Sequence, residues 1–148
     1  MTRDEAFASD TVVTGTLLFN NKPARVLFDS GATHSFVAAD FAAEHKFPMT
    51  PLGLNLSVNT PSGTSLLAHL GCKDGIICIG GKLVYLDAIV LDIKDYDIIL
   101  GMDWLGACNA TIDCAAKTVT FRIPGVPEFC YSCGEASLVQ DSWDLSRY

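Results

Sequence analysis

The segment VLFDSGATHSF, residues 26–36, carries one acid out of an apolar run and into a turn of small residues. Residues 26–28 have the composition of a buried strand, because branched aliphatic and aromatic side chains favour strands. Asp29 follows directly, and the three residues after it are Ser, Gly and Ala. A carboxylate on a protein surface needs no such setting. The segment therefore raises the question of which chemistry Asp29 performs, and with which partner.

The composition is that of one acidic domain rich in apolar residues. At 148 residues the chain has the size of a single domain and is long enough to bury a core. Hydrophobic residues make up 49% and charged residues 18%, below the roughly 25% charged content of an average soluble domain. The apolar surplus is compatible with a subunit interface in addition to a core. The net charge of −7 argues against a phosphate-backbone binder, so we expect no nucleic-acid partner.

No segment predicts a membrane span or a secretory signal. The apolar stretch 83–91 is short and contains Asp87, whereas a spanning helix needs about 20 apolar residues. Residues 1–10, MTRDEAFASD, carry charges and lack the apolar centre of a signal peptide. We therefore expect an intracellular protein with no membrane partner.

The six cysteines favour neither a disulfide framework nor a zinc site. Cys130 and Cys133 form a CxxC pair, but zinc needs a second ligand pair at suitable spacing, and none follows. The three histidines also lack metal-ligand spacing, so we expect no metal and no other cofactor. In a long, core-rich chain we expect the other four cysteines to be reduced and to lie in or beside strands: Cys72, Cys78, Cys108 and Cys114.

Alternating apolar residues between turn residues predict a mostly β chain with one or two short helices. The Ala-rich segment 35–45 predicts a helix that Thr33 or Ser35 could cap, and residues 102–107 predict a second one. The expected strands form hairpins, with one further buried run at 96–101: 11–19 with 24–28, 54–58 with 64–68, 75–79 with 83–91, and 110–114 with 118–123.

This pattern indicates a small closed barrel or folded-sheet domain. We expect the domain to span residues 11–123. Residues 1–10 form a polar lead-in, and residues 124–148 have the looser composition of a C-terminal extension or linker.

A carboxylate that ends a buried strand in a Ser-Gly turn suits catalysis by paired acids. Two carboxylates about 3 Å apart cannot both ionise, so they share one proton. The ionised partner can then activate a water while the protonated partner polarises a peptide carbonyl. Gly31 lets the backbone come close where a larger side chain would obstruct it. The hydroxyl of Ser30 can tie two active loops together.

At this point the sequence resembles a known family. FDSGA (28–32) is similar to the catalytic Asp-Ser/Thr-Gly-Ala motif of retroviral-type aspartic proteases, the retropepsins. About seventy residues later, IILG (98–101) resembles the signature that packs beneath the active loop in that fold. GATHSF (31–36) and YDIILGMDWL (96–105) are similar to the protease regions of Ty3/Gypsy-type retrotransposon polyproteins, as found in plants. The likeness runs from Thr11 to Ile123, and it implies a retropepsin-like fold.

The resemblance also implies a role for each matching residue. Asp29 matches the catalytic acid, and Ser30 matches the position that cross-braces the two active loops of a dimer. Gly31 and Ala32 match the residues that complete the turn and line the substrate cleft. Two further sets follow the family pattern: a flap that closes over a bound peptide, at Asn59, Thr60, Pro61, Ser62, Gly63 and Thr64, and a support of the active loop, at Ile98, Ile99, Leu100 and Gly101.

The chain contains a single Asp-Ser/Thr-Gly element. Asp74 precedes a glycine in a turn and Asp113 precedes a cysteine in a strand, so neither repeats it. One chain therefore cannot complete an acid pair. A two-fold homodimer, in which Asp29 of each copy meets at the axis, is the symmetrical solution.

The leading hypothesis is thus a homodimeric aspartic endopeptidase that processes a polyprotein. Three alternatives stay open. Asp29 could be a structural acid bonded to the amides of its own turn. The domain could be a catalytically silent dimerisation or peptide-binding module with the same fold. It could also be a cellular relative that acts on ubiquitin-linked substrates.

Overall fold

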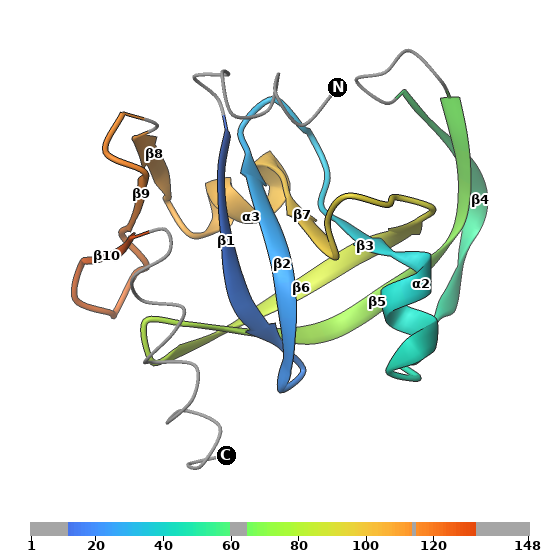
Figure 1. Cartoon of the computed structure of the whole chain (residues 1–148), viewed down its shortest axis with the longest axis horizontal. Helices are drawn as coiled ribbons and strands as arrows, with labels where there is room; N and C mark the ends of the chain where they lie inside the picture. The colour runs from blue at the N-terminus through green and yellow to red at the C-terminus, as the bar shows by residue number, and fades with distance from the viewer. Residues whose placement is uncertain (1–11, 60–64, 114, 133–148) are drawn as a thin grey trace.

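The computed structural model describes residues 12–59, 65–113 and 115–132 (Figure 1). Strands dominate this part of the chain, and two short helices accompany them, as the sequence predicts. No helix among these residues is long and apolar enough to cross a membrane. The elements are, in chain order, β1 (Val12–Phe19), β2 (Lys22–Asp29), β3 (Phe36–Ala38), α2 (Ala39–Glu44), β4 (Thr50–Asn59), β5 (Ser65–Ile79), β6 (Lys82–Leu91), β7 (Ile98–Leu100), α3 (Met102–Ala107), β8 (Thr111–Asp113), β9 (Thr118–Phe121) and β10 (Phe129–Ser132).

The main sheet closes into a barrel. Its order is β1-β2-β7-β3-β6-β5-β4, and an additional pairing of β1 with β5 completes the ring. That closing contact is short, with Phe19 opposite Ile77 at the end of β1. Asn20 extends it, because its main-chain N–H donates to the Ile76 carbonyl (2.8 Å) and its Oδ1 accepts the Ile76 N–H (2.9 Å). The predicted closed, mostly β domain is confirmed.

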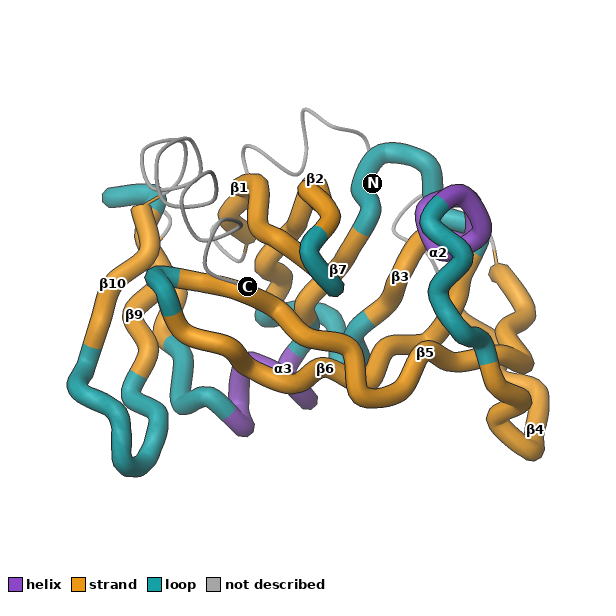
Figure 2. The backbone as a smooth tube through the Cα atoms, turned by 90° about the horizontal axis from the view of Figure 1, so that it is seen from below, coloured by secondary structure: helices purple, strands orange, loops and turns teal. Residues whose placement is uncertain are grey.

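The remaining elements lie around this barrel. β4 pairs with β5, and the hairpin that these two strands form extends beyond the ring (Figure 1). β8, β9 and β10 form a separate three-stranded sheet. Seen from below, this small sheet lies at one end of the molecule, and β4 with α2 lies at the other (Figure 2).

The last part of β2, residues 26–28, is buried on both faces, which explains its continuous apolar run. Val26 and Phe28 are 0% exposed and belong to the main core. Leu27 points to the opposite face and packs with Tyr96 in a second apolar cluster. A strand that is covered on both sides has little freedom to move, so it can hold the residue at its end precisely.

β5 joins two of the expected hairpins. The sequence predicts separate strands at 64–68 and 75–79, whereas β5 runs without interruption from Ser65 to Ile79. Its pairing with β6 shifts register between Cys72 and Gly75. Such an irregularity bends a strand locally, and this allows one long strand to pair with both β4 and β6.

The helix expected over 35–45 begins later than predicted. Residues 36–38 form β3, which pairs in parallel with β6 and antiparallel with β7. Ala38 occupies the N-cap position of α2 and makes no side-chain cap. The prediction that Thr33 or Ser35 caps this helix is therefore wrong, because strand pairing in the folded barrel overrides the local helix preference.

β10 belongs to the folded body, although the sequence placed residues 129–132 in a loose extension. These residues pair with β9. Tyr131 is 2% exposed, its ring lies 5.7 Å from that of Phe28, and its hydroxyl donates to the Thr16 carbonyl (3.3 Å). Gly15 leaves room for this ring, since a Cβ there would overlap the Tyr131 hydroxyl. The packed core thus continues into β10.

The described residues include four cysteines, and no disulfide joins them. Cys72, Cys78 and Cys108 are buried; the first two lie in β5, and Cys108 follows α3. Burial raises the pKa of the Cys72 thiol, and it raises that of Cys108 to about 11, so both stay protonated at neutral pH. Cys114 and Cys133, the second residue of the CxxC pair, lie outside the described residues.

The buried position of Tyr131 predicts a large loss of stability when it is truncated. Tyr131→Ala should lower the free energy of unfolding by about 3–5 kcal/mol, the usual cost of deleting a buried aromatic ring. Tyr85 is the matched control, because it is 73% exposed, and Tyr85→Ala should change the free energy by less than about 0.5 kcal/mol. Urea unfolding measures both values. Equal effects for the two variants would contradict the packing of β10 against the core.

Candidate active site

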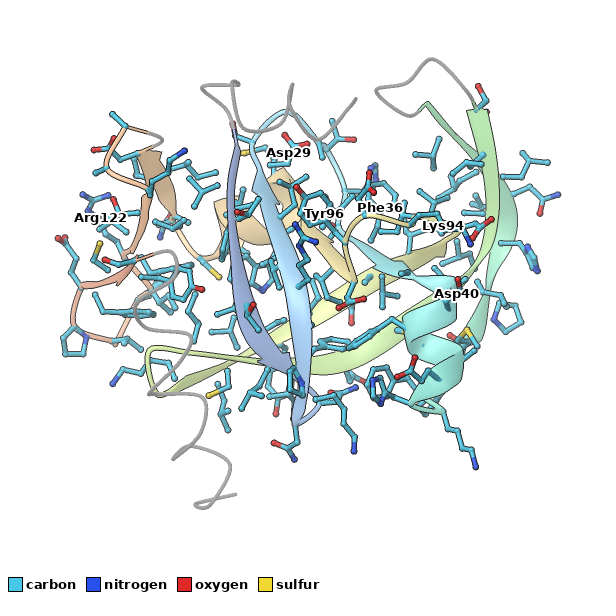
Figure 3. All side chains as sticks on the ribbon, in the orientation of Figure 1. Asp29, Phe36, Asp40, Lys94, Tyr96 and Arg122 are labelled. Atoms are coloured by element: carbon cyan, nitrogen blue, oxygen red, sulfur yellow. The ribbon has the colours of Figure 1, made fainter. Side chains whose placement is uncertain are left out.

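Asp29 is the last residue of β2 and is held by its own turn (Figure 3). Its Oδ1 accepts the main-chain N–H of Gly31 at 2.8 Å, and its carbonyl accepts the N–H of Ala32 at 3.2 Å. Ser30 and Gly31 are exposed, and Asp29 is half-buried. The turn, which we call the active loop (residues 29–32), therefore presents an oriented carboxylate at the end of a rigid strand.

β7 lies between the strand that enters the active loop and the strand that leaves it. It pairs in parallel with β2, where Leu100 is opposite Phe28. It also pairs antiparallel with β3, where Ile99 is opposite Phe36. Ile98 and Leu100 are 0% exposed and belong to the main core. The structure thus brings the IILG segment directly beside the active loop.

Asp97 fixes the entry to β7. Its Oδ2 accepts the main-chain N–H of Arg25 (2.9 Å), and its own N–H donates to the Arg25 carbonyl (2.8 Å). Its carbonyl accepts the N–H of Ala38 (2.8 Å). Asp97 therefore bonds to β2 and to β3 at the point in the chain just before β7 begins.

Gly101 allows the chain after β7 to approach the active loop closely. A Cβ at Gly101 would lie 2.8 Å from the carbonyl oxygen of Ala32 and closer still to that of His34. Both are backbone atoms, which cannot move aside as a flexible side chain can. The glycine of the IILG segment is therefore required here for space.

Two main-chain hydrogen bonds join the start of α3 to the active loop and the residue after it. The N–H of Met102 donates to the Ala32 carbonyl at 2.7 Å. The N–H of Asp103 donates to the Thr33 carbonyl at 3.3 Å. The exit of the active loop is thus connected to α3, and we call the whole contact between residues 32–35 and 101–104 the loop–helix junction.

Sequence reasoning missed Ser35 as part of this junction. Ser35 is 0% exposed and is the buried polar residue of the described chain. Its hydroxyl donates to Asp103 Oδ1 at 2.6 Å and accepts the N–H of Gly101 at 3.0 Å. Its position four residues beyond Gly31 was visible in the sequence, but the Ala-rich segment after it favoured a helix cap. These contacts give Asp103 a structural role in the junction.

The β4–β5 hairpin contains the segment for which the resemblance implies a flap. Asn59 is opposite Ser65 at the described end of this hairpin, and residues 60–64, which include most of the expected flap tip, lie outside the described residues. The part of the hairpin nearer the barrel is apolar on one face. Its partly buried residues Leu56, Val58 and Leu66 pack with the buried cluster of Phe36, Ala68 and Leu91.

Charged pairs lie away from the active loop. Lys94 bonds to Asp92 (2.8 Å) and to Asp40 of α2 (3.1 Å), and Figure 3 shows Lys94 and Asp40 on the far side of Tyr96 from Asp29. Hydrogen bonds to Asp92 and then to Asp40 raise the pKa of Lys94. All three side chains are exposed, so these pairs add little stability. The His, Cys, Asp and Glu side chains of the described residues form no group of three that could hold a metal ion.

The closed barrel and the turn that carries its lone acid define a retropepsin-like domain. Residues 1–124 match the family model described as retroviral aspartyl protease. The chain therefore belongs to the retroviral aspartyl protease family.

Solved structures show the same fold. The EIAV protease, complexed with the inhibitor HBY-793, is 23% identical with a TM-score of 0.54, and the match covers 67% of this chain and 89% of that chain. The retroviral protease-like domain of Ddi1 from Leishmania major is 14% identical with a TM-score of 0.59, over 86% of this chain and 99% of that chain. No curated protein matches this chain.

The close approach at Gly101 predicts that even a methyl group is destabilising there. Gly101→Ala should lower the free energy of unfolding by about 1–3 kcal/mol, because the backbone around the active loop has to shift. Gly106 of α3 is the matched control, since a Cβ there meets no atom within 4 Å. Gly106→Ala should be neutral or stabilising by about 0.5–1 kcal/mol, as expected for alanine in a helix. Urea unfolding gives the free energy of unfolding of both variants. An unchanged value for Gly101→Ala would contradict the close backbone contact at the loop–helix junction.

Proposed function

We propose that the protein is an aspartic endopeptidase that is active as a homodimer, with one Asp29 supplied by each chain. One observation carries the proposal. The single Asp-Ser-Gly turn follows residues 26–28 of β2, which are buried on both faces, and it is supported by β7 and the start of α3. Membership of the retroviral aspartyl protease family supports the same chemistry.

The proposed reaction needs two carboxylates and one water. A pair of acids at about 3 Å holds one proton between them. The ionised acid removes a proton from the water, whose oxygen attacks the peptide carbonyl carbon, and the protonated acid gives its proton to the carbonyl oxygen. The tetrahedral intermediate then returns that proton as its C–N bond breaks, and the acid that took the proton of the water donates it to the leaving amine. A two-fold axis would bring Asp29 of both copies to the same place. The Gly31 N–H on Oδ1 would hold each carboxylate in a fixed orientation.

The proposed substrate is an extended peptide of a retrotransposon polyprotein. It would lie between the active loop and the β4–β5 hairpin, whose apolar face includes Leu56, Val58 and Leu66. Apolar walls with a few polar groups are typical of such binding sites. The likeness of residues 31–36 and 96–105 to Ty3/Gypsy-type proteases supports the polyprotein as substrate. The reduced, buried cysteines are consistent with an intracellular setting.

A second candidate function is a silent dimerisation or peptide-binding module. The bond between Asp29 Oδ1 and the Gly31 N–H favours it, because a purely structural turn acid makes the same contact. Binding of peptides without cleavage between about pH 4 and pH 7, where a coupled acid pair titrates, would support this candidate.

Replacing Asp29 separates the two candidates. Asp29→Asn should lower kcat for peptide cleavage by at least about 10²-fold, because an amide cannot take up the proton of a water. The fold should remain, since the amide oxygen of Asn can still accept the Gly31 N–H. Peptide cleavage assays measure kcat, and thermal unfolding checks the fold.

The control for this variant is Asp74→Asn. Asp74 lies at the exposed register shift of β5 with a φ of 58°, a conformation that asparagine tolerates well. Asp74→Asn should therefore cleave like the wild type. A wild-type kcat for peptide cleavage in Asp29→Asn would contradict the proposed catalytic role.

The need for two chains predicts an unusual dependence on enzyme concentration. Well below the dissociation constant of the dimer, halving the total enzyme should cut the cleavage rate about fourfold, because dimer concentration then follows the square of total chain concentration. Initial rates over a dilution series measure this dependence, and sedimentation at the same concentrations gives the oligomeric state. A rate that stays proportional to the concentration of a solitary chain would contradict the homodimer.

A further inference from the structure

The loop–helix junction contains a polar pair that the proposed reaction does not use directly, the buried Ser35 and the exposed Asp103. Ser35 donates twice to Asp103, from its hydroxyl to Oδ1 (2.6 Å) and from its main-chain N–H to Oδ2 (3.2 Å). Asp103 Oδ1 also accepts the N–H of Trp104 at 2.7 Å. A carboxylate can only accept, so both of its oxygens are committed to donors from this junction.

The hydroxyl of Ser35 connects three segments. It accepts a hydrogen bond from the N–H of Gly101, which follows β7, and donates one to Asp103 of α3. Ser35 itself precedes β3 and has no exposed surface, so water cannot replace these partners. Loss of the hydroxyl would leave the Gly101 N–H buried without this acceptor.

The pair acts on the active loop through the main chain. Met102 and Asp103 follow Gly101 in the chain. Their main-chain N–H groups donate to the carbonyls of Ala32 and Thr33, respectively. Trp104 and Leu105 anchor α3 in the main core, and the contact between Asp103 and Ser35 adds a side-chain bond at the start of the helix, beside these two main-chain bonds. A displacement of about 1 Å at a reacting group is enough to slow a reaction strongly.

We propose that Ser35 and Asp103 are positioning residues, which hold the exit of the active loop so that Asp29 meets Asp29 of a second copy in a reactive geometry. This inference rests on the proposed function. It assigns to the pair an effect on the chemical step, in addition to any effect on stability.

The first test compares three residues at position 35 in the full chain. Ser35→Ala should lower kcat by about tenfold or more and leave KM within about twofold, because the peptide-binding walls are untouched while the acids are misplaced. Ser35→Thr keeps the hydroxyl and should recover most of the lost kcat. A purely structural role would lower the melting temperature of Ser35→Ala without changing the kcat of the folded enzyme, and that result would overturn the proposal.

The second test uses a matched pair of aspartates. Asp87 Oδ1 accepts the N–H of Asp74 at 2.8 Å, so it is also a carboxylate that bonds to a distant main-chain N–H, but within the β5–β6 pair. Asp103→Ala should lower kcat as Ser35→Ala does, and Asp87→Ala should leave it unchanged. Equal kcat values for the two aspartate variants would overturn the assignment.

Hydrogen exchange provides a measurement that does not depend on activity. Amides in residues 29–36 should exchange at least about tenfold faster in Ser35→Ala and Asp103→Ala than in Asp87→Ala, because the junction no longer protects them. Unchanged exchange there would overturn the proposal. If the wild type cleaves no peptide at any concentration, the proposed function fails, and the exchange result alone decides whether the pair positions the loop.

Discussion

The site depends above all on the close contact of two backbone segments, the active loop with its exit and the start of α3. Gly101 approaches the carbonyls of Ala32 and His34 so closely that no side chain fits. The next two residues then donate their main-chain N–H groups to carbonyls of the loop and its exit. Backbone bonds of this kind leave little room for adjustment, which is why a turn made of small residues can still present its carboxylate in one orientation.

This contact requires a particular barrel. β7 has only three residues, yet it pairs with β2 on one side and β3 on the other, in opposite senses. The two strands that enter and leave the active loop are therefore held apart by a strand from much later in the chain. Closure of the ring by β1 and β5 completes the enclosure of this central group. The buried Tyr131 adds cover from the C-terminal side of the chain.

The same architecture explains why a single chain offers only half of the proposed acid pair. The barrel builds one active loop, supported by one β7 and one α3, and the sequence holds no second Asp-Ser/Thr-Gly element. Each chain thus orients its own Asp29 by itself, whereas in the proposed dimer the two-fold axis supplies the second acid from the other copy. The Ser35–Asp103 pair belongs to the part that each chain builds alone.

The sequence by itself determined the Asp29 turn, the later IILG segment and most of the hairpins, because these depend on local spacing and on residue types with strong turn or strand preferences. It did not determine that residues 36–38 form a strand, that β5 is continuous, or that Tyr131 of β10 enters the core. It also did not assign Ser35 to the junction with Asp103. Those outcomes were decided by the tertiary structure, since each depends on pairing or packing between segments far apart in the chain, which local periodicity does not encode.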